Sequence, residues 1–197
     1  MKKKSSTDSI LRQMFVTRTL GFVDVSEKRF FWSDFAQQTA GIFKIKHTIS
    51  RDLASLNLVI PIENGQIEFN ESDTHPLKVV ATVNSDKQIG FAVTKKDYMD
   101  TLLKFLGCRY ATSFHPDFDS KYVVKCHDEK SVRSILKCES IISLILKTNL
   151  FSISCEFDNK KSEIEIISMV GRSVNSINEL QDVYHLFRII IDQIQRL

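Results

Sequence analysis

Apolar and polar residues alternate between short turn signals, and this feature restricts the fold of the chain most. Residues 43–48 alternate strictly, and residues 56–62 form a second apolar run. Asn64-Gly65 follows that run, and both residue types accept the positive φ of a two-residue hairpin turn. Residues 67–69 begin the returning strand. Because successive side chains of a strand point to opposite faces of a sheet, the pattern predicts half-buried strands joined as an antiparallel hairpin.

Three further pairs of alternating stretches predict three more hairpins. They are residues 77–83 with 89–94, residues 108–114 with 122–126, and residues 151–157 with 164–166. The connections are turn-like, namely Asn84-Ser85-Asp86-Lys87, Pro116-Asp117-Phe118 and Asp158-Asn159-Lys160-Lys161. In the last hairpin we expect Cys155 opposite Ile164 and Ile153 opposite Ile166, because this register pairs apolar side chains across the two strands.

Helical periodicity occupies the stretches between these hairpins. Residues 10–20 and 94–106 each show one apolar face that ends at a glycine. Asp128 can cap the helical pattern that follows it, over residues 128–146. The apolar face of this pattern shifts near Cys138, which predicts either a kink or two separate helices.

The C-terminal segment carries the clearest helical signal. Ser176 and Glu179 have the spacing of a capping box, in which the two side chains satisfy backbone N–H groups at the start of a helix. A stripe of apolar residues at helical spacing then runs almost to the end of the chain: Leu180, Val183, Phe187, Ile190, Ile191 and Ile194. We therefore expect a long C-terminal helix that packs against the core.

Hairpins with helices inserted between them define the predicted fold class. It is α+β, with a largely antiparallel sheet built from hairpins and packed by several helices, including the long C-terminal one. The 197 residues are 43% hydrophobic and 26% charged, which is ordinary for one globular domain. We predict a disordered polar tail over residues 1–8 and a single α+β domain over residues 9–197.

Charge and composition argue against several classes of protein. The net charge is only +3, and the one basic run, Lys2-Lys3-Lys4, lies in the polar tail. Nucleic acid is therefore not expected as a partner. No apolar stretch approaches the length of a membrane span, and no signal peptide is recognisable. The four cysteines form no C-x-x-C pair and are interpreted as reduced core residues of a cytoplasmic protein: Cys108, Cys126, Cys138 and Cys155.

His115, Asp117 and Asp119 form the best candidate for a chemical site. In an extended segment, alternate residues point to one side, so an imidazole and two carboxylates could bind a metal ion. The competing interpretation is a turn, because Pro116 fixes φ and Asp side chains accept backbone hydrogen bonds. We favour the turn, expect no cofactor, and keep the metal site as an alternative. Asp128 is interpreted as a helix N-cap.

An aromatic cluster over residues 30–35 is the best candidate for a binding surface. Trp32, Phe31 and Phe35 could pack in the core, or they could form an exposed patch that receives a peptide or a partner subunit. The secondary structure of residues 22–40 stays open, because Ser33 can cap a short helix while the aromatic run also suits a strand.

No set of polar residues at compatible spacing commits the chain to catalysis. The sequence therefore favours a soluble, non-catalytic binding or protein-interaction module with an unknown protein or peptide partner. The alternative is a metal-dependent or hydrolase-like enzyme with its site near His115–Asp119. A third possibility is a regulator that touches nucleic acid through Lys2–Lys4. The oligomeric state and the strand order are not predicted.

Overall fold

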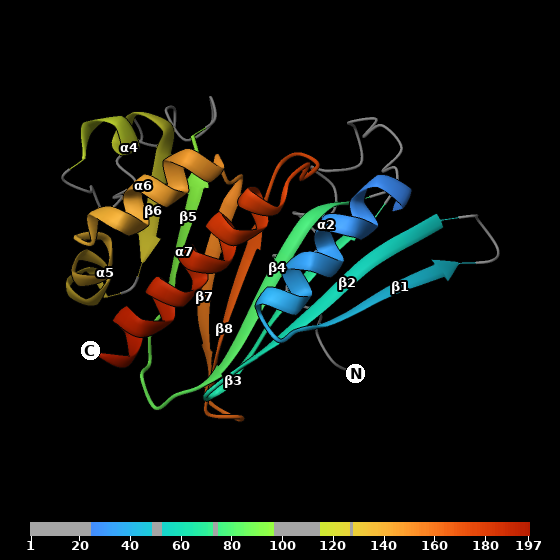
Figure 1. The fold of residues 1–197 in the computed structure, drawn as a ribbon. Helices are drawn as coiled ribbons and strands as arrows, with labels where there is room; N and C mark the ends of the chain where they lie inside the picture. Colours follow the sequence, from blue (N-terminus) through green and yellow to red (C-terminus); the bar gives the residue numbers. More distant parts are fainter. Residues whose placement is uncertain (1–24, 49–52, 73–74, 97–114, 127) are drawn as a thin grey trace, which may run out of the picture.

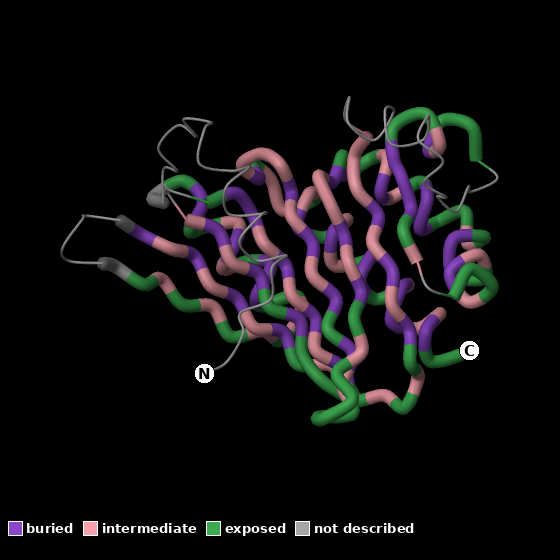
Figure 2. Tube along the Cα trace, turned by 180° about the vertical axis from the view of Figure 1, so that it is seen from behind, coloured by how far each residue is buried: buried purple, intermediate pink, exposed green. Residues whose placement is uncertain are grey.

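In the computed structural model, the described residues form an antiparallel sheet of eight strands, in the order β1-β2-β3-β4-β8-β7-β5-β6. The described residues are 25–48, 53–72, 75–96, 115–126 and 128–197. Helices α2, α6 and α7 lie across one face of the sheet (Figure 1). Seen from behind in Figure 2, the strands lie in front, and buried positions alternate along them with partly or fully exposed ones. The α+β class with a largely antiparallel sheet is confirmed.

The elements follow one another along the chain as α2 (Val25–Gln38), β1 (Ile42–Thr48), β2 (Leu53–Ile62), β3 (Gly65–Ser72), β4 (His75–Asn84), β5 (Phe91–Lys95), α4 (Pro116–Lys121), β6 (Tyr122–Cys126), α5 (Glu129–Leu136), α6 (Glu139–Thr148), β7 (Ser152–Asp158), β8 (Glu163–Met169) and α7 (Ile177–Gln195). The open question about residues 22–40 is thereby answered for the described part, which is helical from Val25. The predicted helices over residues 10–20 and 94–106 lie outside the described residues, as does the predicted strand over 108–114.

Strands β1 to β4 form a meander in which each strand pairs with the next. The predicted hairpin at Asn64 is confirmed, with Glu63 and Asn64 as the two loop residues between β2 and β3. Gly65 serves a different purpose from the one expected. It is the first residue of β3, and a Cβ atom there would lie 1.9 Å from the Thr82 carbonyl oxygen. Glycine is therefore required by the close approach of β4.

The predicted hairpin of residues 77–83 with 89–94 is wrong. β4 pairs with β3 and β8, whereas β5 pairs with β6 and β7. The β7–β8 hairpin lies between β4 and β5, and residues 85–90 pass its turn, where the Ser85 N–H donates to the Ser162 carbonyl at 3.0 Å. A short polar connection between two apolar strands fits this crossover as well as it fits a hairpin, so the local pattern could not distinguish them.

The β7–β8 hairpin is confirmed, but its predicted register is wrong by two residues. Cys155 lies opposite Ile166 and Phe157 opposite Ile164. The turn has the expected four residues but occupies 159–162, one position later than predicted, and it ends at Ser162 with φ of 55°. A slip of two residues leaves every side chain on the same face of the sheet, so apolar alternation alone cannot detect it.

The helical caps follow the sequence closely. The Asp128 carboxylate accepts from the Lys130 N–H at 3.0 Å, as predicted for an N-cap. The chain breaks into α5 and α6 at Cys138, which is the N-cap residue of α6. At the start of α7, the Ser176 hydroxyl accepts from the Glu179 N–H at 3.3 Å, which confirms Ser176 as the N-cap. The Glu179 carboxylate accepts from the Asn175 N–H rather than from the Ser176 N–H, so the second half of the predicted capping box is displaced by one residue.

The described cysteines Cys126, Cys138 and Cys155 are free thiols, and Cys108 lies outside the described residues. Burial raises the pKa of the Cys155 thiol from 9.0 to about 12. Only the thiolate reacts with iodoacetamide, so Cys155 is expected to stay unmodified in the native protein while the partly exposed Cys126 and Cys138 react. Mass spectrometry after timed alkylation measures this order. All three should react alike in denaturant, and native Cys155 reacting at its denatured rate would contradict the burial argument.

Candidate functional site

Helix α2 carries the aromatic residues that the sequence proposed as a binding surface, and it places them differently. Trp32 and Phe35 are 0% and 1% exposed and belong to the core. Phe35 packs edge-on against Phe69, with ring centroids 5.6 Å apart. Phe31 is only partly buried and packs against the same core. Trp32 and Phe35 therefore do not form an exposed patch, and the surface candidate moves to the neighbouring face of the helix.

That face of α2 forms a groove with strand β1. The groove has a volume of about 390 Å³ and is lined by Arg29, Phe30 and Ser33 from α2 and by Phe43 and Ile45 from β1. The short connection between the two elements fixes their separation, because the Gly41 N–H donates back to the Ala36 carbonyl at 2.8 Å. The floor of the groove is packed against the core, since the Trp32 and Phe43 rings lie with centroids 6.0 Å apart.

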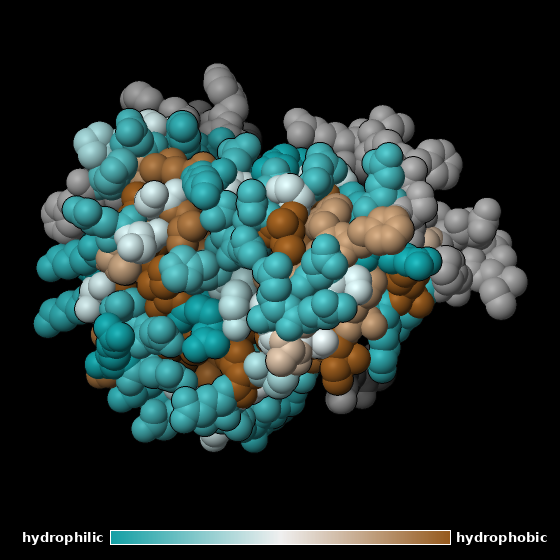
Figure 3. Space-filling view, viewed as in Figure 1, coloured by the Kyte–Doolittle hydropathy of each residue, from teal (hydrophilic) through white to brown (hydrophobic). Residues whose placement is uncertain are grey.

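Apolar side chains are exposed beside this groove. Among the described residues, three large hydrophobic side chains are exposed, namely Phe30 at 67%, Ile42 at 60% and Leu197 at 41%. Phe30 and Ile42 belong to α2 and β1, the two elements that form the groove. In Figure 3, hydrophobic side chains show between hydrophilic ones over α2 and β1, on the right of the molecule. Exposed apolar surface beside a hollow is typical of a site that binds another molecule.

Positive charge lies at the groove and on the other face of β1. The Arg29 guanidinium lies over the Phe30 ring, 5.6 Å from its centroid. Lys44 and Lys46 are exposed on β1, alternating with Phe43 and Ile45. Within the described part of the chain, none of these three cations forms an ion pair with an acidic side chain. Their charges are therefore available to a ligand.

Strand β1 is also an edge of the sheet. Its residues pair with β2 from Ile42↔Val59 to Thr48↔Leu53, and no other described strand pairs with it. An edge strand presents a row of backbone N–H and C=O groups that have no partner in the sheet. The groove thus combines an apolar floor, positive charge and an open backbone edge.

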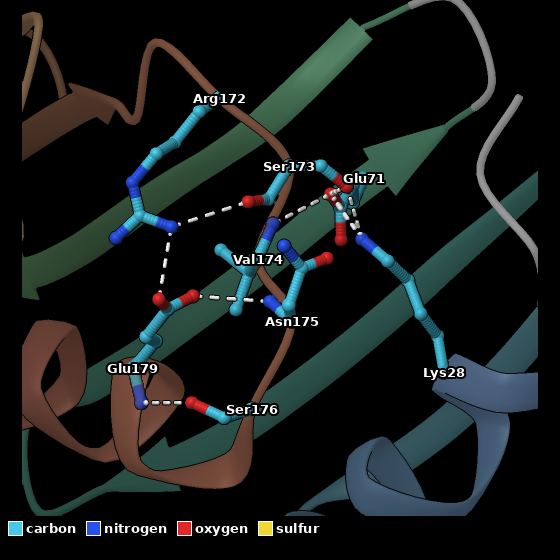
Figure 4. Close-up of polar contacts among 8 residues, drawn as sticks. All are labelled: Lys28, Glu71, Arg172, Ser173, Val174, Asn175, Ser176 and Glu179. Carbon is cyan, nitrogen blue, oxygen red and sulfur yellow. Dashed lines mark hydrogen bonds and ion pairs between the residues drawn. The ribbon is translucent and has the colours of Figure 1, made fainter. Parts of the chain in front are cut away.

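A buried polar cluster holds the inner face of α2 in place (Figure 4). Lys28 is 5% exposed and Glu71 of β3 is 0% exposed. The Lys28 ammonium donates to Glu71 Oε1 at 2.7 Å and to the Ser173 hydroxyl at 2.5 Å. The same Glu71 oxygen accepts from the Ser173 hydroxyl and from the Val174 N–H, both at 3.1 Å. One carboxylate oxygen therefore joins α2, β3 and the segment before α7.

The segment before α7 is fixed by a second set of contacts in the same view. Arg172 Nη1 donates to Glu179 Oε1 at 2.9 Å, and the Asn175 N–H donates to Glu179 Oε2 at 3.0 Å. The segment 172–175 is thus tied to Glu71 by its two middle residues and to Glu179, in the first turn of α7, by its two outer residues. Through Glu71 and Lys28, this segment positions α2 and with it one wall of the groove.

A lysine beside a serine hydroxyl can be a nucleophilic pair in an enzyme, with the lysine amine as base. Here the ion pair with Glu71 requires Lys28 as an ammonium, which has no lone pair to take a proton from Ser173. The carboxylate is also completely buried, so a substrate cannot reach it. The geometry is that of a structural clamp. The sequence analysis did not find this cluster, although Glu71 follows Ile67 and Phe69 at an inward-facing position of β3.

The His115–Asp119 segment is helical, so the prediction of a turn there is wrong. Pro116 is the first residue of α4, and His115 is its N-cap, with Nδ1 accepting from the Phe118 N–H at 3.4 Å. Residues two apart on a helix point to different sides, so Asp117 and Asp119 do not converge as they would on a strand. Among the described residues, no group of three or more His, Cys, Asp or Glu side chains is arranged to hold a metal ion.

No known protein family matches the chain. No curated protein sequence matches it either. Among solved structures, the crystal structure of the mycobacterial trehalose monomycolate transport factor A, TtfA, is similar with a TM-score of 0.44 and 7% sequence identity. The similarity covers 85% of this chain and 97% of that chain. At this level of similarity, the site has to be interpreted from its own residues. In the described part of the chain, no helix is both long and apolar enough to cross a membrane.

Proposed function

We propose that this protein is a non-catalytic binding module, and that the groove between α2 and β1 receives a segment of a partner protein. The observation that carries the proposal is the coincidence of three features at one place. They are the apolar groove floor of Phe43 and Ile45, the exposed Phe30 at its rim, and the open backbone edge of β1. The groove floor and Phe30 offer apolar contact to the side chains of a bound peptide segment. The edge of β1 offers hydrogen bonds to its backbone.

The test selects peptides from a random phage-displayed library on the immobilised wild-type protein and measures their affinity for variants. Phe30→Asp is expected to weaken the selected peptides roughly tenfold or more, because burial of a phenylalanine side chain contributes about 1.5–3 kcal/mol. Phe30 is 67% exposed, so the fold should tolerate the change.

Leu197→Asp is the matched control. It replaces another exposed large hydrophobic side chain, at the C-terminus and outside the groove lining, and should leave affinity unchanged. Selected peptides that bind both variants equally well would contradict the assignment of the groove. A library that yields no enriched sequence would contradict the proposal that the protein binds peptide segments.

A further inference from the structure

We infer, building on the proposed function, that the partner segment is an extended strand that pairs with the outer edge of β1 and alternates apolar with acidic residues. The inference begins with the backbone. β1 is an extended strand of residues Ile42–Thr48 and is hydrogen-bonded to β2 along its inner edge. No other described strand pairs with its outer edge, which therefore offers a row of donors and acceptors that a strand satisfies more completely than a helix does.

The alternation of β1 sets the pattern of side chains in an added strand. Phe43 and Ile45 are partly buried and line the groove beneath α2, whereas Ile42, Lys44 and Lys46 are exposed on the opposite face of the sheet. Residues of an added strand that lie beside Phe43 and Ile45 share the groove face and should be apolar. Residues beside Lys44 and Lys46 share the other face.

Charge complementarity predicts which residues the added strand carries on the face that it shares with Lys44 and Lys46. Neither Lys44 nor Lys46 forms an ion pair with a described acidic residue, and their cross-strand neighbours on β2 are Asn57 and Ser55. Opposite charges on directly facing strand residues stabilise pairing, whereas like charges oppose it. Acidic residues in the added strand would place a carboxylate beside each lysine.

The same lysines oppose a second copy of this chain as the occupant in the register that would use all of β1. If two β1 strands paired antiparallel about Ile45, Lys44 of one copy would face Lys46 of the other. Two such like-charge contacts would oppose the dimer. Lysines on an edge strand are a common device against self-association, and here they leave an acidic strand as the complementary partner.

The experiment uses the full-length protein and a fluorescein-labelled peptide in which glutamate and isoleucine alternate between terminal threonines. Fluorescence anisotropy measures its binding. A peptide of identical composition with its glutamates grouped together, and one with lysine in place of glutamate, are both expected to bind roughly tenfold more weakly or worse. The double variant Lys44→Glu/Lys46→Glu should reverse the preference between the glutamate and lysine peptides.

A third peptide keeps the alternating side chains but carries N-methyl groups on alternate backbone amides, so it cannot complete a ladder. Loss of binding by this peptide is the expected result. Equal binding would show that side chains alone hold the segment, which overturns strand addition and leaves the groove function intact. Binding that Phe30→Asp does not weaken would overturn both proposals. A stable dimer of the wild type in sedimentation, lost on Lys44→Glu/Lys46→Glu, would assign the edge to a second copy and overturn the inference.

Discussion

Deletion of residues 180–197 is expected to abolish the cooperative unfolding of this protein. The deletion removes most of α7, whose buried side chains are each at most 4% exposed: Leu180, Val183, Leu186, Phe187, Ile190, Ile191 and Ile194. At about 1.5–3 kcal/mol for each side chain, their burial contributes on the order of 10–20 kcal/mol, which matches or exceeds the net stability of a typical domain. Thermal unfolding followed by circular dichroism should show no cooperative transition.

Two control variants distinguish the loss of α7 packing from the effect of shortening the chain. Removal of Arg196 and Leu197 alone, which are both exposed, should leave the transition close to that of the intact protein. Phe187→Ala keeps the full length but opens a cavity in the core, and is expected to cost about 3–5 kcal/mol. A near-normal transition in the 180–197 deletion would show that the sheet is stable without its largest helix, and would contradict the packing described here.

Loss of either partner of the Lys28–Glu71 pair is the second large effect. Lys28→Met leaves a fully buried carboxylate unpaired, and Glu71→Gln leaves a buried ammonium unpaired. Each is expected to reduce the free energy of unfolding by about 3–5 kcal/mol, because an unpaired buried charge keeps its desolvation cost without its Coulombic compensation. Urea denaturation of the single variants measures both losses.

The double variant Lys28→Met/Glu71→Gln should be destabilised by much less than the sum of the two single changes, because no charge then remains buried. Glutamine keeps an oxygen that can still accept from the Val174 N–H. The Lys147–Asp182 pair is the control, since it has a comparable distance of 2.9 Å but a lysine side chain that is 64% exposed. Lys147→Met should cost less than about 1 kcal/mol. Additive losses in the double variant would mean that Lys28 and Glu71 are not coupled.

Features that depend on neighbouring residues could be predicted from the sequence. The helix of residues 177–195 follows from a cap and an apolar stripe within one segment, and the α5–α6 break follows from a shift in periodicity at Cys138. The fold class follows too, because alternation and turn signals recur along the chain. At His115, local reasoning failed in one respect, since proline and aspartate suit the first turn of a helix as well as a turn between strands.

Features that depend on pairing between distant segments could not be predicted. Nothing in residues 75–95 indicates that β4 and β5 are neighbours of β8 and β7 rather than of each other. The candidate site could not be predicted for the same reason, because it also depends on contacts between distant segments. Its groove brings Phe30 of α2 next to Ile45 of β1, and the clamp behind it joins residues 28, 71 and 173. The sequence proposed residues of α2 as a binding surface, and two of them, Trp32 and Phe35, are buried in the core.

The position of the β7–β8 hairpin determines the order in which the chain can complete its sheet during synthesis. Strands β1 to β4 can pair as they leave the ribosome, because each one follows its partner. The far edge of β4 has to wait for residues 163–169 of β8, which are synthesised well after β4 itself. Until then, the growing chain presents an unpaired strand in what will become the middle of the sheet, and such an edge is prone to pair with other chains. A chain stalled on the ribosome before residue 163 would therefore expose the unpaired edge of β4 and be prone to aggregate.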